Sequence, residues 1–266
     1  MRFLKRKQLG RLATATVLIP AAFFSAQAAM ACSVDNWSGG TVGTLNAAQP
    51  NDVTNAAARY SGACALEIAG DQTAFVQDNS PAGIERIIAR FYLLADNSSN
   101  AVVYRGRGDG GSTLFQVVLA ANGTVTASSG AGSATGTAIP GEWNSFEIDW
   151  SSGTGIELIV NGIDGGASGS SNTSAAGMLQ NVRLGNINGA SGTLSFDAYE
   201  SRRTTAIGRL VVADANASGD VTGGDLSVIA SEILGNGLAL GQPDCNESGE
   251  VTGADLSCTA AIILGL

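Results

Sequence analysis

The sequence predicts a mainly β protein, in which an all-β sandwich or barrel is followed by a small α-helical module. Up to about residue 205, short apolar runs alternate with turns rich in Gly, Ser, Asn and Thr, which is typical of sandwiches and barrels. No sustained helical period interrupts this part. Near the end, one acidic, glycine-containing pattern is written twice, at Asp214–Leu226 and Asp244–Leu256, and an apolar-periodic segment follows each copy.

The first 31 residues have the pattern of a secretory signal peptide. A basic start, which includes Arg2 and Arg11, leads into the apolar stretch Leu12–Phe24, and two Ala-x-Ala sites end at Ala28 and Ala31. The apolar stretch is broken by Pro20 and is shorter than the roughly 20 residues that a membrane span needs. We expect a secreted protein, extracellular or periplasmic, with the signal removed and no membrane span.

The charge of the mature chain favours cations as partners. The sequence has 14 basic and 23 acidic residues, and five of the basic ones lie in the predicted signal. Nine basic against 23 acidic side chains leave a net charge of −14. Such a chain repels phosphate backbones, so we expect no nucleic-acid partner and consider divalent cations the natural ligands.

Residues 32–205 are predicted to form the sandwich. In the stretch WNSFEIDW, residues Phe146, Ile148 and Trp150 alternate with Glu147 and Asp149, so that one face of a strand is apolar. The candidate strands are Arg86–Ala95, Ala101–Arg105, Thr113–Ala120, Thr124–Ala127, Trp143–Trp150, Gly155–Asn161, Met178–Gly185 and Gly192–Glu200.

Four cysteines and the absence of histidine restrict the chemistry. Cys32, Cys64, Cys245 and Cys258 suit an oxidising compartment, and of the three pairings we favour Cys32–Cys64 with Cys245–Cys258, which keeps each bridge within one domain. Without a histidine, hydrolases that rely on a histidine base and zinc sites built on imidazole are excluded.

The sandwich region resembles laminin-G and concanavalin-A-like jelly rolls. The resemblance rests on GEWNSFEIDW, GIELIVNG, RLGN and GTLSFDAYESRR, which give a Trp-led strand, a strand ending in Asn-Gly and a strand near the end of the domain. It covers most of residues 65–203 and implies a domain that binds carbohydrate or protein, or a glycosidase, since the fold alone does not decide the function.

An enzymatic reading rests on Glu147 and Asp149. They resemble the start of the Glu-x-Asp-x-Glu strand of retaining β-glucanases, in which two carboxyls about 5–5.5 Å apart act as nucleophile and acid. The fifth position here is Ser151, so the second catalytic carboxyl is missing. These residues are weak catalytic candidates, and two outward charges on a half-exposed strand are the simpler interpretation.

A lectin-like reading needs aromatic platforms on an open face. The candidates are Trp143, Trp150, Tyr92 and Tyr104, together with Arg105, Arg107 and Asp109 in the loop after one strand. The alternative for each aromatic residue is packing in the core, and aromatics make up only 6% of the chain. We expect an extracellular glycan or a protein as the partner of this domain.

The repeated pattern has the ligand spacing of an EF-hand-type calcium loop. Oxygen donors fall at positions 1, 3, 5, 7, 9 and 12, the seventh through its backbone carbonyl, and glycine occupies position 6, where the chain turns sharply. The ligands are Asp214, Asn216, Ser218, Asp220, Thr222 and Asp225 in loop 214–225, and Asp244, Asn246, Ser248, Glu250, Thr252 and Asp255 in loop 244–255. We therefore predict two calcium ions.

Each loop is expected to lead into a helix. Leu226, Ile229, Ile233 and Leu234 share one helical face, and Leu256, Thr259, Ile263 and Leu264 repeat it. Two loop-then-helix units resemble the type I dockerin module, which binds a cohesin through loop positions 10 and 11 and the following helix. Those positions hold Gly223–Gly224 and Gly253–Ala254, which offer a cohesin-like partner little side-chain surface.

The expected organisation is therefore a signal at 1–31, a sandwich at 32–205 and a calcium module at 206–266. We expect an exported, non-catalytic protein whose sandwich binds carbohydrate or protein and whose tail binds calcium and docks or acts as a structural clamp. Two alternatives are a glycoside hydrolase or accessory protein of polysaccharide breakdown, and a structural surface protein without a ligand.

Overall fold

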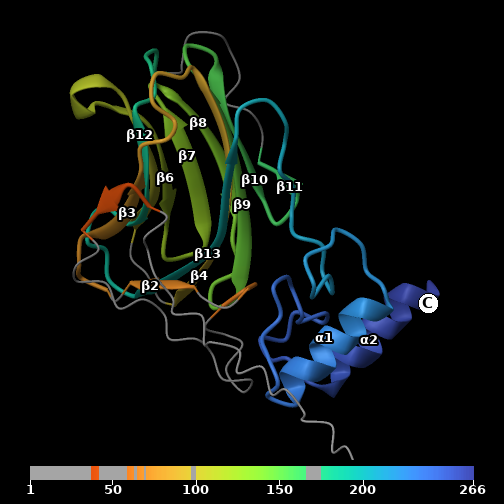
Figure 1. Ribbon diagram of the computed structural model, residues 1–266. Coiled ribbons are helices and arrows are strands. Elements are labelled where there is room, and N and C mark those ends of the chain that lie inside the picture. Colours follow the sequence, from red (N-terminus) through yellow and green to blue (C-terminus); the bar gives the residue numbers. More distant parts are fainter. Residues whose placement is uncertain (1–36, 42–58, 63–64, 69, 97–99, 166–174) are drawn as a thin grey trace, which may run out of the picture.

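The protein consists of two antiparallel β-sheets packed face to face and two helices at its C-terminal end (Figure 1). The computed structural model describes residues 37–41, 59–62, 65–68, 70–96, 100–165 and 175–266. The predicted signal peptide, Cys32 and Cys64 lie outside these residues. The predicted fold class, a jelly-roll-like β-sandwich with a small helical module, is confirmed.

The first sheet has seven strands, and its neighbouring strands are antiparallel throughout. In spatial order these are β1 (Gly39–Gly40), β3 (Ala74–Asp78), β12 (Asn181–Asn186), β5 (Ala101–Arg107), β6 (Thr113–Leu119), β7 (Thr124–Ser129) and β8 (Gly132–Thr137). A short 3-10 turn, η3 (Asp109–Gly111), joins β5 to β6. The non-sequential order means that strands far apart in the chain become neighbours.

The second sheet has six strands and covers the inner face of the first. Its spatial order is β11 (Ile163–Asp164), β10 (Gly155–Val160), β9 (Trp143–Ser151), β4 (Arg86–Asp96), β13 (Thr193–Arg202) and β2 (Leu66–Ile68). The predicted alternation of β9 is confirmed, because Phe146, Ile148 and Trp150 are fully buried. The Trp150 indole donates a hydrogen bond of 2.9 Å to the Ser129 hydroxyl, so the one polar atom of the Trp150 side chain has a partner inside the core.

The eight predicted strands are present, but five others were not predicted. Strands β1, β2 and β11 have two or three residues, and β3 has five. Strand β8 reads GSATGT, so small residues hide its alternation. The strand predicted over Met178–Gly185 begins at Asn181, because Leu179 forms only an isolated bridge to Ile84. Such strands form because they pair with a longer neighbouring strand, and their own sequence has too few alternating apolar residues to predict them.

Two helices form the C-terminal module, α1 (Gly223–Ile233) and α2 (Gly253–Leu264). They share a small apolar cluster of Ala215, Ile229, Ala239 and Val251, against which Val228, Ile233 and Leu256 pack. The predicted face is wrong at its end: Leu234, Ile263 and Leu264 are exposed. Leu234 is already the cap residue after α1, and Ile263 and Leu264 lie in the last turn of α2, beyond the cluster.

Within the described part of the chain, neither helix has the length and apolar character that a bilayer crossing requires.

Candidate metal centre and its junction with the sandwich

The first predicted calcium loop is folded around its position-1 carboxylate. Asp214 accepts hydrogen bonds from the backbone N–H groups of Ser218 and Gly219, at 2.9 and 2.7 Å. The side-chain oxygen of Asn216 also accepts from the Ser218 N–H, at 2.9 Å. Gly219 has φ +93°, the left-handed conformation that its position in the sequence predicts. The sharp turn therefore directs the oxygens of positions 1, 3 and 5 toward one centre.

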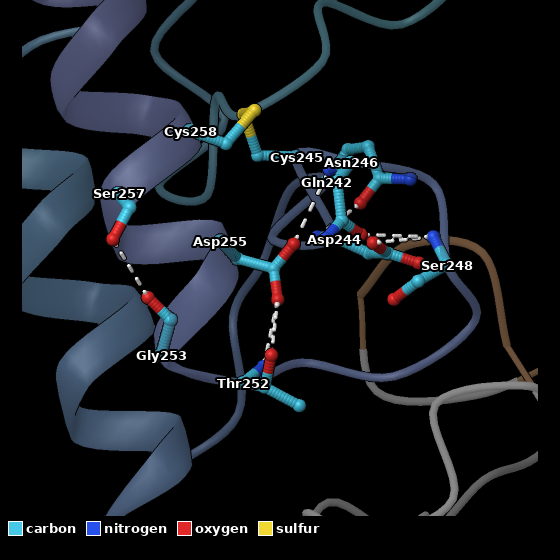
Figure 2. Close-up of a disulfide and its surroundings, with 10 residues drawn as sticks. All are labelled: Gln242, Asp244, Cys245, Asn246, Ser248, Thr252, Gly253, Asp255, Ser257 and Cys258. Carbon is cyan, nitrogen blue, oxygen red and sulfur yellow. Dashed lines mark hydrogen bonds between the residues drawn. A yellow bond between two sulfur atoms is a disulfide. The ribbon is translucent and has the colours of Figure 1, made fainter.

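The second loop repeats this geometry (Figure 2). Asp244 accepts from Ser248 and Gly249 at 3.0 and 2.7 Å, Asn246 accepts from Ser248 at 3.0 Å, and Gly249 has φ +89°. The sequence repeat is thus a repeat in three dimensions. Position 4 is left-handed in both copies, at Ala217 and Glu247, and this strain was not predicted because neither residue is glycine or asparagine.

The last two ligand positions also start the helices. Thr222 is the N-cap of α1, and its hydroxyl accepts from the Gly224 N–H at 3.2 Å. Asp225 accepts from the backbone N–H groups of Thr222 and Asn216, at 2.7 and 3.0 Å. The same capping box stands at Thr252 and Asp255 before α2. Each position-12 carboxylate therefore fixes its loop to its helix.

Buried negative charge gathers in both loops without a basic partner. Asp225 and Asp255 are 0% exposed, and Asp214 and Asp244 are 6% and 8% exposed. The ion pairs of the described residues include none of the four. Backbone N–H groups donate to these carboxylates, but no basic side chain of those ion pairs neutralises them, so a bound cation would lower the cost of burying their charge.

Burial and hydrogen bonding shift the pKa values of two of these carboxylates in opposite directions. The pKa of Asp244 is raised to about 6, mainly by burial and also by the negative charge of Asp255, although hydrogen bonds from Gly249 and Ser248 oppose the rise. Burial also raises the pKa of Asp225, but hydrogen bonds from Thr222 and Asn216 outweigh it, so the net pKa lies below the usual value. Burial therefore dominates the pKa of Asp244, whereas hydrogen bonds together outweigh burial at Asp225.

The neutral oxygens fit a hard cation. The Ser218 hydroxyl lies 3.1 Å from the Asp220 carbonyl oxygen and 3.5 Å from an Asp214 carboxylate oxygen. In the second loop, the Ser248 hydroxyl oxygen lies 3.2 Å from the Glu250 carbonyl oxygen. Oxygens that share a Ca²⁺ ion at 2.3–2.6 Å are expected about this far apart. No group of three or more His, Cys, Asp or Glu side chains converges on one point in the described residues, because each loop combines two carboxylates with neutral donors.

The two weak catalytic candidates are engaged in structural contacts. Glu147 is 9% exposed, and its two oxygens accept from the backbone N–H groups of Ile207 and Gly208, at 3.2 and 2.5 Å. Asp149 forms a two-point pair with Arg86, at 3.0 and 2.5 Å. The interpretation of two outward charges on a half-exposed strand is thus wrong for Glu147, because the linker that leads to the helical module covers this side chain.

Most of the aromatic residues considered for sugar binding are buried, Trp150 and Tyr104 in the core and Tyr92 beneath Tyr60. Trp150, Tyr92 and Tyr104 are 0% exposed, so these rings cannot contact a ligand. Trp143 is half-buried at the start of β9 and lines a cavity. Arg105 and Arg107 are half-exposed on β5, and Asp109 is exposed in η3. The residues that remain available on the sandwich are therefore mostly charged rather than aromatic.

Comparisons with known proteins find likeness at the level of fold. No family model matches the chain, and no curated protein matches it. Among solved structures, a sialidase shares 15% identity over 63% of this chain with a TM-score of 0.42, and a cellulose-induced protein, Cip1, shares 17% over 68% with a TM-score of 0.48. The botulinum neurotoxin serotype D ligand-binding domain in complex with N-acetylneuraminic acid shares 10% over 62%, with a TM-score of 0.43. The matches cover 17%, 92% and 43% of those chains, so this chain spans about a sixth of the sialidase.

A short segment, Arg59–Gly62, joins the helical module to the sandwich. The Arg59 guanidinium forms a buried ion pair with Glu232 of α1, with side chains 3% and 1% exposed. On the sandwich side, the N–H groups of Tyr60 and Ser61 donate to the Asp197 carboxylate at 2.6 and 2.8 Å. Asp197 is half-buried, and partial removal from water raises its pKa to about 6 although these hydrogen bonds oppose the rise. Sequence patterns gave no sign of this junction, because its partners are far apart in the chain.

The second predicted calcium loop is held next to the sandwich through Tyr60 and Arg209. Tyr60 stacks on Tyr92 with a ring separation of 3.7 Å, and its hydroxyl donates to Glu247, at position 4 of the loop, at 3.2 Å. Arg209 in the linker pairs with the same carboxylate at 2.8 Å. A cavity of about 310 Å³ lies beside these contacts, between Trp143 and Ser248. Loop 244–255 is thus held against the sandwich by side chains on both sides.

The structure joins Cys245 to Cys258 in a disulfide, which is the local pairing favoured from the sequence. The first loop carries Ala215 and Val228 at the matching places. We expect the Cys245→Ala/Cys258→Val variant to lose about 3 kcal/mol of stability in the second loop, from the entropy of a loop of roughly 14 residues. Urea unfolding at fixed calcium measures the loss. Free thiols or a cross-domain bridge in non-reducing peptide maps would contradict the pairing.

We also expect no β-glucanase activity that depends on Glu147. The carboxylate is occupied by the linker, and Ser151 stands where the second catalytic carboxyl would be. The mature protein and its Glu147→Gln variant should be equally inactive on mixed-linkage and β-1,3 glucans, as measured by release of reducing ends. Turnover that disappears in the variant would contradict this expectation.

Proposed function

We propose that the protein is an exported, non-catalytic protein whose C-terminal module binds two calcium ions and whose β-sandwich binds carbohydrate. The observation that carries the calcium proposal is the repeated pair of buried carboxylates without a basic partner, Asp214 with Asp225 and Asp244 with Asp255. Calcium supplies the missing positive charge. Two carboxylates per loop predict weak binding, about 10⁻⁴–10⁻³ M, as in extracellular modules.

The module acts, in this proposal, as a clamp on its own sandwich. Its loop-then-helix repeat resembles a dockerin, whose cohesin contacts would use Gly223–Gly224 and Gly253–Ala254. These residues are exposed but carry almost no side chain. Glu247 of the second loop instead contacts Tyr60 and Arg209 of the same chain. These contacts support an intramolecular role for the second loop.

The carbohydrate part of the proposal rests on the sandwich. Its strand pattern resembles the laminin-G and concanavalin-A-like jelly rolls, and its seven-stranded sheet presents a row of outward polar side chains. Amide, guanidinium and hydroxyl groups are suited to bind sugar hydroxyls. The core aromatics do not contribute, because Trp150, Tyr92 and Tyr104 are buried.

Calorimetric titration of the full mature chain tests the calcium proposal. We expect about two ions per chain, one after Asp214→Asn, and none after the Asp214→Asn/Asp244→Asn double substitution, because each change removes the position-1 ligand. The full chain is the right object, since the junction with the sandwich is part of the folded module. Heat without saturable stoichiometry would contradict the proposal.

A glycan array, probed with the mature chain in calcium and again in chelator, tests the carbohydrate part. We expect saturable binding to at least one glycan class in calcium. Absence of binding in both conditions would contradict it.

A further inference from the structure

Six polar side chains form one continuous row across the outer face of the seven-stranded sheet. Each is the direct cross-strand partner of the next, from β3 through β12, β5, β6 and β7 to β8. All six are half-exposed or exposed, while their neighbours along each strand face the core. This polar row consists of Gln77, Arg183, Arg105, Gln116, Ser128 and Ser133. With strands about 4.8 Å apart, it spans roughly 24 Å.

Like charges are concentrated in the middle of the row. Arg183 and Arg105 stand directly opposite each other on β12 and β5, and Arg107 lies two residues along β5 on the same face. The pKa of Arg105 is lowered by burial and by Arg107, and that of Arg183 by burial, Arg107 and Arg105. No ion pair of the described residues involves these three side chains. Like charges directly opposite in a sheet are destabilising, so the Arg183–Arg105 pair lowers the stability of the protein when no anionic ligand is bound.

Neutral groups hold the guanidinium groups in place without cancelling their charge. Arg183 lies over the Phe75 ring at 4.1 Å and donates through Nε to Gln77 at 2.8 Å. Arg105 donates to Gln116 at 3.2 Å, and its Nε, which is buried, has no hydrogen-bond partner. Each guanidinium keeps further N–H donors for a ligand. The row is therefore a preorganised set of positive donors in a chain that is otherwise strongly acidic.

We propose that this row binds an acidic polysaccharide, with Arg105 and Arg183 pairing with its carboxylate or sulfate groups. The proposal rests on the proposed carbohydrate binding and adds the class of glycan and the surface. Guanidinium groups recognise carboxylate and sulfate oxygens through paired N–H donors, and Gln77, Gln116 and Ser128 are placed to bind the sugar hydroxyls beside them. A linear glycan that crosses the strands meets all of these groups in succession.

Charge and chemistry favour a glycan over a nucleic acid as the occupant. Three arginines in a chain with 23 acidic residues provide little of the counterion release that binding to a phosphate backbone needs. Single strands also need exposed aromatic rings for stacking, and the row offers only Phe75, which is buried and lies under Arg183.

Calorimetric titration of the mature chain with three matched hexasaccharides tests the proposal. The probes are hexagalacturonate, a heparin-derived hexasaccharide and neutral maltohexaose, and the first two separate carboxylate from sulfate recognition. We expect binding to at least one acidic probe, weakening with salt, and a loss of about 100-fold in the Arg105→Gln/Arg183→Gln variant, since two charge-assisted contacts disappear. Its melting temperature should be unchanged or higher, because a like-charge pair is removed.

The matched control is Arg86→Gln/Arg202→Gln, which removes the same charge from the other sheet. It should bind the acidic probes as the wild type does. An equal loss in this control, stronger binding to maltohexaose, or equal affinity for an oligothymidylate would overturn the proposal. If the chain binds maltohexaose alone, the proposal of an acidic polysaccharide is wrong, but the proposed carbohydrate binding stands. If a glycan array shows no binding at all, both proposals are wrong.

Discussion

Chelation of calcium is expected to lower the free energy of unfolding of the full chain by about 3–5 kcal/mol relative to 10 mM calcium. A ligand that binds only the folded state stabilises it by RT ln(1 + [L]/Kd), which gives about 1.4–2.7 kcal/mol per site for a Kd of 10⁻⁴–10⁻³ M. The physical source is the relief of repulsion between buried carboxylates such as Asp244 and Asp255. Urea unfolding with and without chelator measures the difference.

Matched variants separate ligand loss from charge loss. Asp214→Asn and Asp244→Asn should each remove about half of the calcium effect. Asp220→Asn and Glu250→Gln remove one charge each at position 7, where only the backbone carbonyl is a ligand. These two variants should keep the calcium response. A response that is lost equally in both sets, or a chelator without effect, would show that the loops are not calcium sites.

Arg59→Met is expected to destabilise the protein by about 3–5 kcal/mol. The substitution leaves Glu232 with its side chain 1% exposed and without its cation, and breaking one half of a buried ion pair typically has this effect. Glu232 also accepts from the Ala239 N–H at 2.7 Å, so it cannot turn away without leaving that donor unpaired. Chemical denaturation in calcium, followed by near-ultraviolet circular dichroism, measures the loss.

The Arg86–Asp149 pair provides the control for this prediction. Its side chains are 45% and 22% exposed, so Arg86→Met should cost no more than about 1 kcal/mol. Adding Glu232→Leu to Arg59→Met should recover part of the stability, because it removes the buried charge itself. Similar small losses at Arg59 and Arg86 would mean that the junction contributes little to stability.

The sequence predicted those features of the fold that depend on residues close together in the chain. The alternation in β9 was sufficient to predict its apolar face, and the glycine at position 6 was sufficient to predict the sharp turn of each loop, because both depend on residues close together in the chain. Calcium binding by these loops stays a prediction. The burial of Glu147 could not be predicted, since the linker that covers it lies some 60 residues away. The exposure of Leu234 was missed because the helical period ends one residue earlier than the apolar pattern does.

The polar row and the junction were missed for a related reason. Arg105 was noted as a loop residue, but its cross-strand partner Arg183 comes from β12, and only the sheet order brings the two together. Arg59 likewise has no sequence signal, because its partner lies on α1. Register between distant strands is decided by the whole core, so a single sequence does not reveal which outward side chains become neighbours.

The place of Arg59–Gly62 between sandwich and module has a consequence for the order of folding. Arg59 and its partner Glu232 are 173 residues apart in the chain. Contacts at such a separation carry a loop-closure cost until intervening structure brings the two ends together. Domains generally fold as units, so we expect the sheets to assemble before the junction closes. Failure at this closing step would leave a complete sandwich with an undocked tail, which proteases could remove without touching the sheets.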